Sequence, residues 1–210
     1  MPGHGRRVAA LAVAAAAWAA AAPAQEPAGQ GAGSRPLRSA LSAVVSVSRP
    51  SDEVFRQVYG SVVVPLSAQV DVPVGWNGLI VFGGARYARS SGEASTVGDL
   101  PVVAPLRFRL ASVRAGAGWG WLAGPWQVTV AAGPSVNWYR EEWAGFDLVV
   151  SGREVGFVGE VTAGRSISRR LSVVVRGEYS TAKATPRQDP TLPDAELGGL
   201  DLGGGIAFRF

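Results

Sequence analysis

From about residue 39 onward, apolar side chains alternate with small or polar ones along most of the chain. The register is clearest in segment 200–210, where the even-numbered positions place five large apolar side chains on one face. The odd-numbered positions of the same segment hold only small or charged residues. A period of two with one apolar face predicts a β-strand rather than a helix.

The same alternation recurs along the chain and predicts eight strands. The segments are 41–49, 58–72, 79–89, 104–121, 126–140, 155–167, 171–180 and 200–210. The connections between them alternate in length. The short ones are 73–77, 122–125 and 168–170, and the long ones are 50–57, 90–103, 141–154 and 183–196. Short turns at one end and long loops at the other are typical of an even-numbered outer-membrane barrel.

The positions that face away from the apolar residues hold mostly Gly, Ser, Thr and Ala with a few charged residues. These side chains are too small and too rarely charged for a surface in contact with water. A soluble barrel would point its apolar line inward and its charges outward. We therefore predict an all-β fold, an eight-stranded antiparallel up-and-down transmembrane β-barrel whose apolar face meets lipid. Arginine–carboxylate pairs would fill the narrow interior. The candidates are Arg86, Arg114 and Arg176 with Glu160, Glu178 and Asp71.

In segment 104–121 the apolar line changes sides near Ala111. This change predicts either a β-bulge at that residue or an outer part of the strand that stands beyond the bilayer.

The tryptophans lie at the predicted strand ends, which indicates aromatic girdles at both membrane interfaces. The girdle beside the short turns would hold Trp76, Trp119, Trp121 and Trp126. The girdle beside the long loops would hold Trp138 and Trp143, with Tyr87 and Tyr179.

Composition and the N-terminal residues together indicate the compartment of the protein. The chain is 47% hydrophobic and 17% charged, yet no stretch after residue 24 is long enough for a spanning helix. Residues 1–24 combine Arg6 and Arg7, an apolar run and Ala22-Pro23-Ala24, which predicts a secretory signal peptide. Residues 25–38 then form a flexible periplasmic leader, and residues 39–210 form the barrel domain.

Candidate chemistry is sparse. The chain has no cysteine, and its single histidine, His4, lies inside the predicted signal peptide. A mature chain without histidine cannot build a Ser-His-Asp site, so we expect no enzymatic activity. The glycine clusters lack a following helix and a Lys-Ser/Thr pair, so no nucleotide site is expected. Without cysteine, and without an Asp-x-Asp-x-Asp-Gly calcium loop, no metal or other cofactor site is expected either. The net charge of +4 on an exported chain gives no reason to expect a nucleic-acid partner.

The chain ends Ala207-Phe208-Arg209-Phe210. With the signal peptide and the eight alternating segments, this end resembles the small outer-membrane β-barrel proteins of the OmpX and OmpA-transmembrane-domain type. The resemblance implies that Phe210, Phe208 and Ile206 form the signal that the barrel assembly machinery reads. It also implies residence in the bacterial outer membrane, with membrane lipid and lipopolysaccharide as neighbours.

The leading hypothesis is a monomeric, non-enzymatic membrane barrel with a structural or surface-interaction role. One alternative is a narrow channel or a lateral-opening transporter for small or apolar solutes. Another is a soluble periplasmic barrel that binds a lipophilic ligand. The acidic long loops suggest one further hypothesis, in which divalent cations bridge them to lipopolysaccharide.

Overall fold

The computed structural model describes residues 37–75, 78–97, 100–145, 148–184 and 195–210. The one helix in these ranges, α2 (Glu53–Tyr59), lies between the first two strands. The strands are β1 (Ala40–Pro50), β2 (Leu66–Pro73), β3 (Leu79–Val97), β4 (Leu100–Ala123), β5 (Trp126–Trp143), β6 (Leu148–Ser166), β7 (Leu171–Ala184), β8 (Ala195–Glu196) and β9 (Gly199–Arg209). No helix in the described part of the chain is long and apolar enough to cross a membrane.

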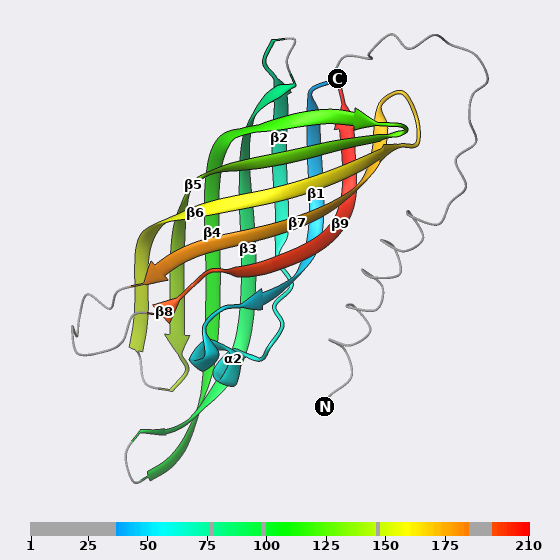
Figure 1. Cartoon of the computed structure of the whole chain (residues 1–210). Helices are drawn as coiled ribbons and strands as arrows, with labels where there is room; N and C mark the ends of the chain where they lie inside the picture. Colours follow the sequence, from blue (N-terminus) through cyan, green and yellow to red (C-terminus); the bar gives the residue numbers. More distant parts are fainter. Residues whose placement is uncertain (1–36, 76–77, 98–99, 146–147, 185–194) are drawn as a thin grey trace, which may run out of the picture.

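The long strands form a closed barrel (Figure 1). Each pairs antiparallel with its neighbour in the chain, β9 pairs with both β7 and β1, and the two-residue β8 only extends the edge of β7. The prediction of an eight-stranded up-and-down barrel is therefore confirmed. Where the barrel is closed, each strand pairs on both sides, which satisfies its backbone hydrogen-bonding groups.

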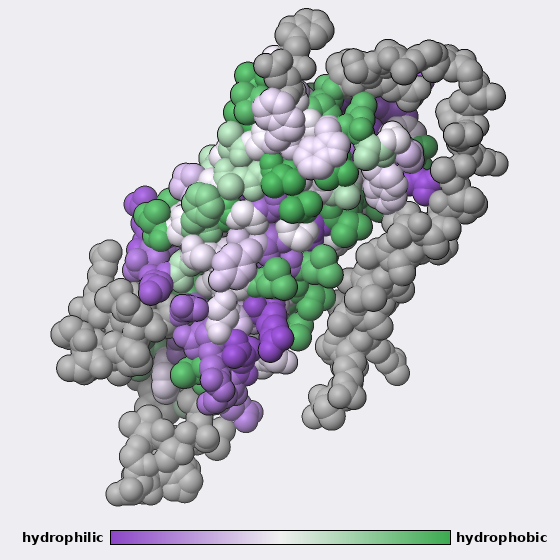
Figure 2. All heavy atoms as spheres, viewed as in Figure 1, coloured by the Kyte–Doolittle hydropathy of each residue, from purple (hydrophilic) through white to green (hydrophobic). Residues whose placement is uncertain are grey.

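In the part of the barrel toward the C-terminus, each strand has an apolar row that points outward. On β6 the outward row is Val155, Phe157, Gly159, Val161 and Ala163, and Val155 is 70% exposed. This row begins after Arg153 and ends before Arg165. At about 3.3 Å per residue, these two arginines lie about 40 Å apart along the strand. With the usual tilt of about 45°, the row is about 30 Å tall, which matches the apolar thickness of a bilayer. Figure 2 shows apolar side chains gathered mainly toward the end with the C-terminus.

The end of the barrel away from the C-terminus differs from the prediction. The loops expected at 90–103 and 141–154 are mostly strand, because β3 continues to Val97 and β5 to Trp143. A strand of 24 residues such as β4 is more than twice the length that crosses a bilayer. These extensions form long hairpins, in which pairing satisfies the backbone groups that a loop would leave to water.

The strand predicted at 58–72 is the second correction, since β2 begins only at Leu66 and α2 occupies residues 53–59. The Asp52 side chain caps the helix by accepting a 2.8 Å hydrogen bond from the Phe55 backbone N–H. Gly60 ends the helix with a φ of 90°, a conformation that favours glycine. A helix of only seven residues is not stable alone, so it depends on packing against the barrel.

The register of β4 is continuous through Ala111, which pairs with Tyr87 on one side and Trp138 on the other. The predicted bulge at Ala111 is therefore wrong. What changes there is the environment: beyond Ala111 the inward residues become apolar and the outward residues become Arg109 and Arg107. This change fits the other alternative, in which the outer part of β4 stands beyond the apolar band.

Candidate functional site

The barrel interior holds a layer of charged side chains that pair across the lumen. Glu160 on β6 and Glu178 on β7 lie directly opposite each other in the strand register. Arg114 reaches them from β4, forming an ion pair with Glu178 and lying 3.8 Å from Glu160. All three side chains are at most 6% exposed. One guanidinium therefore separates two buried carboxylates that would otherwise repel each other.

Two more side chains complete this layer. Arg176 lies 4.0 Å from Glu160 and donates a 2.8 Å hydrogen bond to the Ser42 hydroxyl. The Gln69 amide donates to Glu160 and, at 2.8 Å, to Asp71. We call Arg114, Arg176, Glu160, Glu178 and Gln69 the ionic layer. Its charges are balanced, with two arginines facing two carboxylates.

A second pair lies closer to the long hairpins. The Arg86 Nε is 2.8 Å from an Asp201 carboxylate oxygen, and its Nη2 donates to the Ser48 hydroxyl at 3.2 Å. Both side chains of the pair are less than 10% exposed. Asp201 compensates the charge of Arg86 inside the barrel.

Of the six predicted interior residues, the structure places five in buried positions within these contacts, namely Arg86, Arg114, Glu160, Arg176 and Glu178. Asp71 joins them only through Gln69. Sequence reasoning missed Asp201 and Gln69 as partners. The alternation already put Asp201 on the face of its strand that holds small and charged residues. No neighbouring residue in the sequence indicated that Arg86 would be its partner.

Little space remains on either side of the ionic layer. A cavity of about 20 Å³ lies between Arg86 and the apolar side chains beyond it. A second cavity of about 30 Å³ lies on the other side, beside Asp71 and Thr129. Each has room for one or two water molecules. A larger recess of about 670 Å³ lies at the short-turn end, beside Gln127 and Arg209. At the level of the ionic layer, the charged side chains pack among buried serines and apolar residues such as Ile80 and Phe82, which leaves little room for a solute.

The outer mouth is closed by an apolar cluster that we call the plug. Phe55 and Tyr59 of α2 pack on Phe108 of β4, with ring centroids 4.9 and 5.5 Å from the Phe108 ring. The other buried members are Val63, Ala88, Leu106 and Leu110, with Val58, Tyr139, Trp143 and Leu197 packed around them. Beyond Ala111 the apolar residues of β4 face inward. Leu106, Phe108 and Leu110 therefore form the part of the barrel wall against which α2 packs.

Glu141, beside the plug, gives a first testable prediction. Burial raises the pKa of Glu141 above its ordinary value of 4.5, and Tyr59 and Trp143 lower it by smaller amounts. Because the pKa of Glu141 is higher in the folded state than in the unfolded state, its protonation stabilises the fold. This contribution is complete below the unfolded pKa and is lost as the pH rises through the folded pKa. We expect the protection of the α2 amides against hydrogen exchange, corrected for intrinsic rates, to fall as the pH rises through this range.

The matched variant is Glu141→Gln, in which the protection of α2 should no longer change over that pH range. The same pH dependence in wild type and variant would contradict a role for Glu141.

Some of the residues predicted for the girdles face outward, and their position at a membrane interface stays a prediction. Trp119, Trp121 and Trp138 point outward and are 42–50% exposed. Trp126 is half-buried, with the Arg165 guanidinium 5.9 Å from its ring centroid. Trp143 is a correction: it lies on the inward-facing side of β5 and packs against the plug. Trp76 lies outside the described residues.

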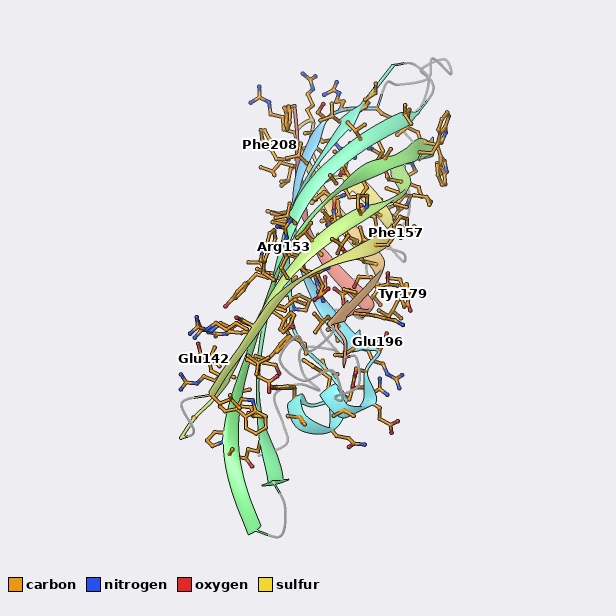
Figure 3. The ribbon with its side chains drawn as sticks, turned by 90° about the vertical axis from the view of Figure 1, so that its left-hand side faces the viewer. Glu142, Arg153, Phe157, Tyr179, Glu196 and Phe208 are labelled. Atoms are coloured by element: carbon orange, nitrogen blue, oxygen red, sulfur yellow. The ribbon has the colours of Figure 1, made fainter. Side chains whose placement is uncertain are left out.

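The C-terminal residues Phe210, Phe208 and Ile206 are 46–66% exposed. Figure 3 shows Phe208 on the outer side of the barrel. Their reading by the assembly machinery stays a prediction.

No protein-family model matches the chain, and no curated protein matches it in sequence. Solved structures do resemble it. OprG of Pseudomonas aeruginosa aligns with a TM-score of 0.63 and 11% identity over 85% of this chain and 98% of that one. Neisserial surface protein A aligns with a TM-score of 0.56 and 14% identity over 82% of this chain and 97% of that one. Ail of Yersinia pestis aligns with a TM-score of 0.50 and 15% identity over 83% of this chain and 100% of that one. The chain has the fold of the small eight-stranded outer-membrane β-barrels.

Proposed function

We propose that the protein is an integral outer-membrane barrel with a closed lumen, a structural or surface-interaction role and no enzymatic activity. The observation that carries this proposal is that the ionic layer and the plug lie in series along the lumen. A hydrated ion would have to separate Arg114 from two carboxylates and then displace α2. Both steps are costly, because breaking a buried pair leaves a charge without a partner.

The apolar outward band supports the membrane location, because a surface of this size would associate in water. The outer-membrane origin of the similar structures supports the choice of membrane. The long hairpins support a surface role, since β3–β4 and β5–β6 extend past the band and are available to contact other molecules.

The absence of activity rests on the same ionic layer. Glu160, Glu178 and Asp201 face one another in the strand register and could act as acid and base, but arginines hold all three in the closed interior. A general acid or base must reach its substrate within hydrogen-bond distance, which this position prevents.

The test is conductance across a planar bilayer, with the refolded full barrel and a general porin as positive control. The closed lumen predicts no discrete current steps from the protein in a bilayer where the porin conducts. Reproducible steps would instead support the narrow-channel alternative. Uptake of an apolar dye into vesicles containing the barrel, at a rate above that of empty vesicles, would support the lateral-opening alternative.

A further inference from the structure

The outward apolar row ends on an arginine in four neighbouring strands. The row of β3 ends at Arg89, that of β4 at Arg109, that of β5 at Arg140 and that of β6 at Arg153, and all four side chains are exposed. Arg107 follows Arg109 on the outward face of β4. We call these five residues the arginine patch. Figure 3 shows Arg153 near the middle of the molecule, with Glu142 farther toward the long hairpins.

The strand register brings the charges of the patch together. Arg89 pairs with Arg109, and Arg109 pairs with Arg140, so three arginines occupy one row across three hydrogen-bonded strands. Like charges directly opposite each other destabilise a sheet. The carboxylate within the patch is Glu142, 2.8 Å from Arg140 and 3.8 Å from Arg109. Among the outward residues described on these strands, the next acid is Glu93, farther out and opposite Pro105. The patch therefore has an excess of positive charge.

The rows beside the patch place it at a membrane interface. The row next to the three arginines contains Tyr87, Ala111 and Trp138, and the row after it contains Val113 and Val136. Arg153 sits with its guanidinium 5.8 Å from the Trp138 ring centroid. Tyrosine and tryptophan side chains lie at the level of lipid headgroups. The order from apolar through aromatic to arginine therefore puts the guanidinium groups at the level of the phosphates.

We propose that the arginine patch binds the phosphate groups of an anionic lipid in the outer leaflet, an inference that rests on the proposed membrane location. Guanidinium matches phosphate oxygens with two parallel hydrogen bonds, and a phosphate between two register-paired arginines would relieve their repulsion. A lipid fits better than a soluble polyanion, because Val113, Val136 and Val155 continue from the patch as an exposed or half-buried apolar surface for the acyl chains.

The test uses the full barrel in detergent micelles, titrated with bisphosphorylated lipid A, its dephosphorylated form and inorganic phosphate. Native mass spectrometry gives the dissociation constant of each probe. The disrupted variant is Arg89→Gln, Arg109→Gln and Arg140→Gln together. Each cation near an anionic lipid contributes about fivefold, so the triple variant should bind lipid A roughly a hundredfold more weakly. Wild-type affinity should fall with added salt, and the dephosphorylated form and free phosphate should bind far more weakly.

The control variant is Arg169→Gln with Arg170→Gln, which removes two exposed arginines at the short-turn end and should leave the affinity unchanged. Equal binding by the triple variant and wild type, or equal binding of both lipid A forms, would overturn the proposal. Tighter binding of a soluble sulfated polysaccharide than of lipid A would assign the patch to a polyanion in solution instead.

Heat-modifiable gel mobility, recorded for every variant, shows that each is folded. A barrel that conducts ions would refute the closed lumen without affecting this lipid assay. A chain that needs no detergent and shows no heat-modifiable mobility would refute the membrane location itself.

Discussion

Replacing Arg114 by leucine should lower the free energy of unfolding by about 3–5 kcal/mol. The variant leaves Glu160 and Glu178 facing each other in the barrel interior, with Arg176 4.0 Å from Glu160 as the remaining cation of that layer. Leucine fills much of the volume but cannot compensate either charge. The measurement is urea unfolding of the barrel in lipid vesicles, followed by tryptophan fluorescence and by heat-modifiable mobility.

Two variants separate this effect from a general sensitivity to losing arginine. Arg109→Leu removes a side chain of the same strand that is 51% exposed, and should change stability by no more than about 0.5 kcal/mol. Adding Glu178→Leu to Arg114→Leu should recover part of the loss, because one unpaired carboxylate is then removed. If Arg114→Leu unfolds at the wild-type urea concentration, the ionic layer does not stabilise the barrel.

Gly205→Val should prevent the barrel from refolding, whereas Gly204→Val should refold like wild type. Gly205 faces inward, and a β-carbon there would overlap the backbone carbonyl of Ala43 on β1. Relieving the overlap would require β9 to move away from β1, at a cost of about 3 kcal/mol. Gly204 faces outward, and the nearest atom to its added β-carbon is 3.8 Å away. Valine suits a strand and would face lipid at that position.

The two variants differ by one position on one strand, so each controls for the other. The measurement is the fraction of each chain that refolds in detergent, read from heat-modifiable mobility. Equal refolding of the two variants would mean that the inward and outward faces of β9 are wrongly assigned.

The alternation predicted the strand count because a strand has a local period of two, and the small, weakly charged residues of the other row indicated which face meets lipid. It also placed Arg114 and Glu178 inside. It could not pair them, since they lie 64 residues apart and meet only when the stagger of the closed barrel is fixed. Arg86 and Asp201 are 115 residues apart, so the same limit applies to them.

The outer end was predicted less well for a different reason. Alternation shows that two faces differ but does not show what each face meets. On β4 the inward residues Leu106, Phe108 and Leu110 are apolar because α2 fills the mouth, and this produced the false indication of a bulge at Ala111. Helix α2 was missed because most of its residues fall in the expected loop 50–57 and its last two in the predicted strand 58–72, and because packing rather than propensity stabilises it.

The absence of cysteine makes one direct test of the lipid-facing assignment possible. Single cysteines placed in turn at positions 155 to 163 of β6 can carry a nitroxide, and electron paramagnetic resonance then reports collisions with oxygen, which partitions into lipid, and with a water-soluble nickel chelate. Labels at 155, 157 and 161 should collide with oxygen and be shielded from nickel, while labels at 156, 158, 160 and 162 should be shielded from both. Nickel access at the outward positions, or loss of the two-residue period, would contradict a barrel that presents its apolar face to the membrane.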